Sequence, residues 1–188
     1  MSLVIIHTVL LLLLCIAAYQ DYHSYIISNI LVVSGALLGV MLNYFLPAGI
    51  GFINSLAGLG VGLLLLLPLY LLRVMGAGDI KLMAMVGAFI GPQAVLISIL
   101  YIMITGGVLA ICVAIYRGVL KSALYRVLGI PIKFIVNLFA SKSNHTLNSY
   151  LSSEISYGAP VKIPYGIAIA IGTAIFLAVH QSAIYYTL

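Results

Sequence analysis

Charged side chains are scarce in this sequence. Asp, Glu, Lys and Arg together make up 6% of its 188 residues, whereas apolar residues make up 64%. A water-soluble domain carries about a quarter charged residues, because polar groups have to cover much of its surface. This composition excludes an ordinary soluble enzyme and predicts that lipid is the main solvent of the chain.

Cysteine and histidine are also few. The two cysteines, Cys15 and Cys112, lie in apolar runs and form no Cys-x-x-Cys pair, so neither a zinc ribbon nor a disulfide framework is predicted. The four histidines show no metal-ligand spacing, and we expect no metal and no cofactor. The net charge of +5 fits the cytoplasmic Lys and Arg of a membrane protein, so no nucleic-acid partner is expected.

Long apolar runs take the place of the missing charge. A helix needs about 20 apolar residues to cross a hydrocarbon core, and continuous rather than alternating runs favour helices over a barrel. The sequence therefore predicts an all-α, polytopic membrane protein, a single membrane-embedded domain over 1–188. We expect about six transmembrane helices, over 3–19, 26–46, 50–72, 80–90, 94–116 and 163–185.

The fourth run, 80–90, is too short to cross a membrane alone. Either the glycine-rich segment before it lies at membrane depth, or the helix is buried among the others and does not meet lipid of full thickness. Both interpretations place Asp79, which directly precedes the run, at the edge of a cavity.

The basic residues predict the orientation. Six spans leave five loops, of which the third holds Arg73 and Lys81 and the fifth holds the other six basic residues, while the second and fourth hold none. Because cytoplasmic loops are enriched in Lys and Arg, we expect the odd-numbered loops in the cytoplasm and the N-terminus outside. Asp21 and Asp79, in the first and third loops, would then lie on the same side.

The fifth loop is expected to be cytoplasmic or interfacial, at about 117–162. Basic and apolar residues are interleaved in its first part, as in an amphipathic helix that lies in the membrane interface, and anchoring to membrane lipids is the main interpretation. The alternative is that the loop controls access of a substrate. Glu154, the only glutamate, has no assigned role.

Asp21 and Asp79 are the only aspartates in the chain. Ionisable groups at the ends of apolar helices are costly and tend to be functional. Two close carboxylates do not both ionise easily, so they share a proton; one can then take a proton from water while the other donates to a scissile amide. A catalytic aspartyl pair that hydrolyses peptides is the leading interpretation. The alternative for Asp79 is that it only caps a helix starting at Ile80.

Several neighbouring residues are weaker candidates for lining the substrate cavity. We expect Gly76 and Gly78 to allow a turn with positive φ and to leave room for a peptide backbone. Lys81 either biases the ionisation of the pair or is an ordinary flanking charge. The full set of candidates is Asn29, Gly76, Gly78, Lys81, Pro164, Tyr165 and Gly166.

Three motifs resemble those of the type IV prepilin peptidases. They are Asp21 followed by Ile27-Ser28-Asn29, then Gly76-Ala77-Gly78-Asp79, then Ile163-Pro164-Tyr165-Gly166. The resemblance implies a multi-pass aspartyl endopeptidase of the bacterial inner membrane, with Asp21 and Asp79 as its catalytic pair facing the cytoplasm. Its substrate would be a prepilin, cut between a basic leader and an apolar helix.

The chain has no cysteine-rich insertion of the kind that larger members of this family carry. In this it is similar to the short prepilin peptidases of tight-adherence (Flp) pili, so N-methyltransferase activity is not expected. Two hypotheses from other classes stay open. One is a proton-coupled transporter with an aspartate relay, which two aspartates on one side fit poorly. The other is a non-catalytic subunit of a pilus or secretion assembly.

Overall fold

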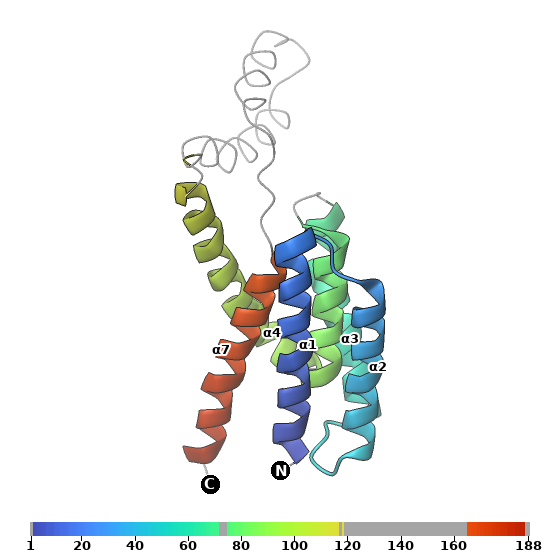
Figure 1. The fold of residues 1–188 in the computed structure, drawn as a ribbon. Helices are drawn as coiled ribbons and strands as arrows, with labels where there is room; N and C mark the ends of the chain where they lie inside the picture. The colour runs from blue at the N-terminus through green and yellow to red at the C-terminus, as the bar shows by residue number, and fades with distance from the viewer. Residues whose placement is uncertain (1, 72–74, 117, 119–164, 187–188) are drawn as a thin grey trace, which may run out of the picture. The chain divides into compact units, whose positions relative to one another are not determined.

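The regular secondary structure is α-helical in the part of the chain that the computed structural model describes, residues 2–71, 75–116, 118 and 165–186. Figure 1 shows the helices. Their bounds are Ser2–Ser24 for α1, Asn29–Phe45 for α2, Phe52–Leu71 for α3, Ala77–Tyr116 for α4 and Tyr165–Tyr186 for α7. Apart from Gly118, the predicted loop at 117–162 with Glu154 lies outside the described residues, as do Arg73 and Pro164.

The chain divides into two compact units, Met1–Gly107 with Pro164–Leu188, and Val108–Ile163. All features discussed below belong to the first unit. The organisation as a single domain over 1–188 stays a prediction.

Three of the described helices, α1, α3 and α4, are long and apolar enough to cross a membrane, by length and composition. Asn29–Phe45 and Tyr165–His180 are shorter apolar helices. The prediction of an all-α membrane protein is thus supported in this coarser form. The fourth and fifth expected spans both lie within α4, which consists of two helical segments joined across a kink at Gly91, and the count of six spans stays a prediction.

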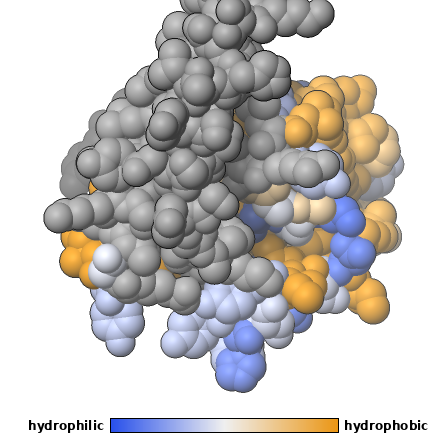
Figure 2. Space-filling view, turned by 90° about the horizontal axis from the view of Figure 1, so that it is seen from above, coloured by the Kyte–Doolittle hydropathy of each residue, from blue (hydrophilic) through white to orange (hydrophobic). Residues whose placement is uncertain are grey.

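The helices of the first unit run in alternating directions (Figure 1). The C-terminal end of α1 and the N-terminal ends of α4 and α7 therefore share one end of the bundle, and the chain termini lie at the other. Helix α1 packs against α7 and α2, and α2 packs against α3. A view onto the first of these ends shows both hydrophilic and hydrophobic surface among the described residues (Figure 2).

The first part of α4 is the most buried segment described. Every residue from Leu82 to Ile90 is buried, whereas Lys81 is exposed. Of the two interpretations of the short fourth run, this burial fits the helix enclosed by its neighbours. A helix shielded by other helices does not need full bilayer length.

Glycines at four-residue spacing bring α2 and α3 close to α4. A side chain on Gly58 would collide with the backbone of Gly87 and Gly91, and one on Gly39 would meet the ring of Phe89. Small residues allow helix backbones to approach closely in lipid, where Leu gains little by leaving the acyl chains. These glycines therefore serve the close packing of α2 and α3 against α4.

Helix α4 is interrupted at Gly91, whose φ of 81° and ψ of 173° are not helical. The next residue, Pro92, has no N–H to offer the carbonyl of Ala88, four residues earlier. Two buried side chains bond this carbonyl instead: Asn43 donates from Nδ2 at 3.0 Å, and Ser55 donates from Oγ. Side chains of α2 and α3 thus satisfy the backbone group that the break leaves without an intrahelical partner.

Candidate active site

Asp21 lies in the last turn of α1 and is 6% exposed. The backbone N–H of Gly166 donates to Asp21 Oδ2 at 2.6 Å. Gly166 is the second residue of α7, so the carboxyl group meets one of the free N–H groups at the positive end of that helix. Asp21 therefore caps a helix more than a hundred residues away and joins the first sequence motif to the third.

Asp79 is the third residue of α4 and is 8% exposed. Its Oδ2 accepts the backbone N–H of Gly76 at 3.3 Å. A carboxylate at the third helical position that accepts from the residue preceding the helix is one half of a capping box. The expectation of an Asp79 cap on a helix from Ile80 is thus corrected: the helix begins at Ala77, and Asp79 caps from within its first turn.

The two carboxyl groups are close enough for Asp21 to act electrostatically on Asp79. Each binds the fold through Oδ2, and no described residue bonds the other oxygen, Oδ1. Tyr165 is half-buried and also interacts electrostatically with Asp79. Two buried carboxyls, each with one oxygen held and the other open, form an arrangement suited to shared proton transfer.

The glycines of the second motif do not adopt the expected conformation. Neither Gly76 nor Gly78 has a positive φ. The reason is that the helix already includes Gly78, which therefore takes helical dihedral angles. The expectation of a left-handed turn is therefore wrong.

Gly166 makes the closest approach to the carboxyl pair. A Cβ atom on Gly166 would lie 2.9 Å from Oδ2 and 3.0 Å from Cβ of Asp21. By contrast, a Cβ on Gly78 would meet Ile27 at 3.4 Å, an ordinary van der Waals contact. The lack of a side chain at position 166 is what lets α7 approach Asp21.

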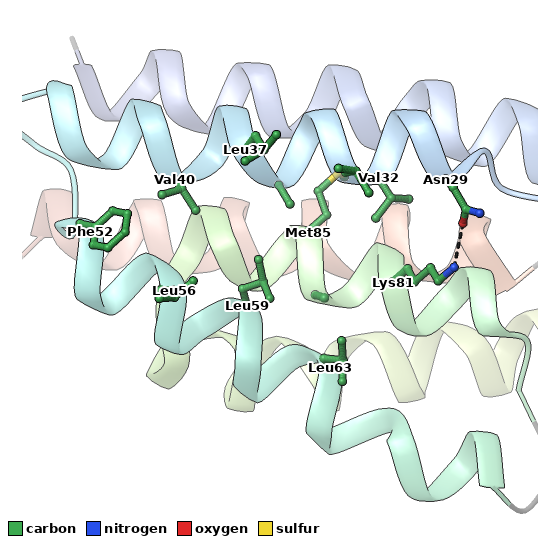
Figure 3. A pocket seen from close by; sticks show the side chains of 13 residues that line it. Asn29, Val32, Leu37, Val40, Phe52, Leu56, Leu59, Leu63, Lys81 and Met85 are labelled. Atoms are coloured by element: carbon green, nitrogen blue, oxygen red, sulfur yellow. Dashed lines mark hydrogen bonds between the residues drawn. The ribbon is translucent and has the colours of Figure 1, made fainter.

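Lys81 does not bond the carboxyl pair. Its Nζ donates to Asn29 Oδ1 at 2.9 Å. Residues two positions apart on a helix point in nearly opposite directions, so Asp79 and Lys81 leave α4 on different faces. Asn29 and Lys81 line a groove between α2 and α3 (Figure 3), which places these two candidates together but apart from the pair.

Sequence reasoning missed the residues that shape the segment after Asp21. Tyr25 ends α1 with a φ of 51°, a left-handed conformation in which its N–H bonds the carbonyl of Asp21 at 2.9 Å. Gln20 Oε1 then accepts the N–H of Ser28 at 3.1 Å, directly before α2. The neighbour of Asp21 thus fixes the path of the loop that follows. The only signal in the sequence for the contact between Gln20 and Ser28 was the glutamine directly before Asp21.

The described residues contain no group of three or more His, Cys, Asp or Glu side chains that could bind a metal ion. Whether Asp79 borders a cavity, as expected from the sequence, stays a prediction.

Comparison with known proteins gives one match. A profile of the type IV leader peptidase family matches residues 8–111, more than half of the chain and a segment that includes Asp21 and Asp79. No curated protein and no solved structure matches the chain. The motifs indicated a resemblance to prepilin peptidases, and the match confirms this resemblance at the family level. Together with the apolar helices, it identifies a family of membrane peptidases. The chain therefore belongs to the type IV leader peptidase family.

Proposed function

We propose that this protein is an aspartyl endopeptidase that removes the basic leader from Flp-type prepilins, with Asp21 and Asp79 as its catalytic pair. The observation that carries the proposal is the meeting of the chain's only two aspartates at one end of the helix bundle. Both are buried, and they interact electrostatically although 58 positions separate them. Burying two neighbouring carboxyl groups is costly, and ionisable groups that are retained in apolar helices despite this cost tend to be functional.

The chemistry follows from two carboxyl groups that hold one proton between them. The ionised carboxylate takes a proton from a water molecule, whose oxygen attacks the carbonyl carbon of the scissile peptide bond. The protonated carboxyl stabilises the developing oxyanion and supplies the proton for the leaving nitrogen. The two groups exchange roles over one turnover, so neither is assigned permanently as the base.

The hydrogen bonds of the site support this use. Gly166 holds Asp21 and Gly76 holds Asp79 through one oxygen each, which fixes the direction in which the other oxygen points. Catalytic groups that are held by the fold lose less entropy at the transition state. Tyr165, beside Asp79, is a candidate for contacting the substrate backbone.

We further propose that the site faces the cytoplasm of a bacterial inner membrane and that the N-terminus lies outside. The concentration of Lys and Arg in the third and fifth loops of the expected six-span topology supports this orientation. A proton-coupled transporter is favoured by no observation, because both carboxyls lie at one end of the bundle rather than near its middle. A non-catalytic assembly subunit would need no buried carboxyl pair.

Co-expression with a Flp-type prepilin tests the proposal. Removal of the leader shifts the precursor on a gel, and we expect this shift with the unaltered chain but not with Asp21→Asn or Asp79→Asn. Asn has the shape of Asp but does not exchange protons at neutral pH. Ser34→Ala is a matched control, because Ser34 bonds only to backbone of its own helix. Processing that survives either Asn substitution refutes the proposal.

A further inference from the structure

An apolar groove of about 670 Å³ runs along the bundle between α2 and α3, with α4 as its floor (Figure 3). The buried residues Ala84 and Met85 form part of the floor, and the exposed side chains of Leu37 and Leu56 stand at the walls. All lining residues apart from Asn29 and Lys81 are apolar. A groove of this composition is suited to an apolar segment that arrives from the membrane.

The two polar residues lie together at one end of the groove, and Phe52 lies at the other (Figure 3). Along α2 the lining extends from Asn29 to Val40, which corresponds to about 17 Å or three helical turns at about 1.5 Å per residue. The groove therefore matches the length of a partner helix over three turns and has a defined polar end.

This polar end is level with the carboxyl pair. Lys81 follows Asp79 by two residues, which is a rise of only about 3 Å along α4. The two side chains leave opposite faces of the helix, so the N-terminus of α4 stands between the groove and the site. Whatever joins the groove to the carboxyl pair has to pass over this helix end.

The helix end is built from the smallest residues. Gly76, Ala77 and Gly78 carry no side chain larger than a methyl group, and both Gly76 and Ala77 are exposed. A side chain on Gly78 would point to Ile27 and not to the surface. An extended backbone can therefore cross at this point without meeting a bulky side chain.

We infer that the groove binds the apolar helix of the membrane-embedded substrate, so that the chain preceding that helix crosses Gly76–Gly78 to reach Asp21 and Asp79. The inference rests on the proposed function and adds to it a docking surface separate from the catalytic pair. Asn29 and Lys81 offer both an acceptor and donors to the backbone at the start of the bound helix. A lipid acyl chain also matches the groove in polarity. It does not account for the alignment of the polar end with Asp79 or for the small residues between them.

Cysteine cross-linking tests where the substrate helix lies. Cys15 and Cys112 are replaced by Ala, and Asp79→Asn retains the uncut precursor. A single cysteine is then placed at Leu37, which lines the groove, or at its neighbour Leu38, which is also exposed but does not line it. The partner is a Flp-type prepilin with a cysteine scanned along its apolar helix, in vesicles of phosphatidylethanolamine and phosphatidylglycerol. We expect disulfide formation at position 37 at least about tenfold above position 38.

A second experiment separates docking from chemistry. Ala36→Phe fills the groove, and Ala57→Phe places the same ring on an exposed position outside it. For the full precursor, we expect Ala36→Phe to raise KM about tenfold, equivalent to about 1.4 kcal/mol, with little change in kcat. For a short peptide that spans the cleavage site but lacks the apolar helix, both variants should behave like the unaltered chain.

The outcomes distinguish the two proposals. Preferred cross-linking at position 37 supports docking even if no variant cleaves any precursor, a result that would refute only the proposed protease. Equal cross-linking at positions 37 and 38 overturns the docking inference and leaves cleavage untouched. Finding that the groove retains phospholipid and excludes the precursor also overturns the docking inference. An unchanged KM in Ala36→Phe overturns it as well.

Discussion

Alanine at position 166 would place a methyl group against the Asp21 side chain. Its Cβ would lie 2.9 Å from Oδ2, 3.0 Å from Cβ and 3.2 Å from Cγ, whereas ordinary contacts begin at 3.4 Å. The shortest contact therefore has to lengthen by about 0.5 Å (3.4 minus 2.9). Rotation of the carboxyl group alone does not relieve the contact with Cβ, because that atom is fixed to α1. The carboxyl pair should therefore shift as α7 moves away from α1.

The expected cost follows from the size of this shift. Because a misplacement of about 1 Å lowers catalytic rates about a hundredfold, a shift of half that size should lower kcat about tenfold. The fold itself should tolerate the change, since alanine favours helix over glycine by up to about 1 kcal/mol. Gly166→Ala is thus predicted to lose activity without losing stability.

The assay is cleavage of a purified Flp-type prepilin by the purified variant in detergent, followed by gel shift over time, with thermal unfolding measured in parallel. Gly60→Ala is the control, because a Cβ at position 60 meets nothing within 4 Å. A kcat for Gly166→Ala within twofold of the control would refute the reasoning that this glycine positions Asp21. Equal loss of activity and of stability would refute it as well.

Three further predictions concern the fold and are checked by unfolding in mixed micelles. Asn43→Leu removes three hydrogen bonds, two of them buried and one partly buried, and should lower the free energy of unfolding by about 3 kcal/mol, at about 1 kcal/mol each; a loss below about 1 kcal/mol would contradict this. Gly58→Ala forces α3 away from α4 and should cost about 1–3 kcal/mol, whereas the control Gly60→Ala should be neutral or stabilising. Tyr25→Gly should stabilise the protein by about 1 kcal/mol, because glycine adopts a φ of 51° without strain; destabilisation would show that the tyrosine ring matters more.

The sequence predicted the parts of the fold that depend on local composition. Apolar runs indicated the helices, and the break in α4 at Gly91 falls in the interval between the expected spans 80–90 and 94–116, where glycine and proline act on the backbone at their own positions. The hydrogen bonds from Asn43 and Ser55 to the backbone at this break were not predictable, because they come from other helices.

The site was predictable only in part. The basic residues of the loops indicated that Asp21 and Asp79 share one side of the membrane, and the structure places both at one end of the bundle. The contact between Asp21 and Gly166 depends on how α1 and α7 pack, which no local pattern encodes. The conformation of Gly78 was mispredicted because the helix starts at Ala77, three residues before the expected Ile80, so that Gly78 takes helical dihedral angles.

The central claim is that Asp21 and Asp79 act as one catalytic unit. Its most direct test is the rate of leader cleavage by four purified proteins: the unaltered chain, Asp21→Asn, Asp79→Asn and the double variant. If the two carboxyls share one proton transfer, removing either abolishes it, so both single variants should lose at least about a thousandfold and the double variant should lose no more. If either single variant retains cleavage within about tenfold of the unaltered chain, or if the two losses add in the double variant, the two aspartates do not form a catalytic pair.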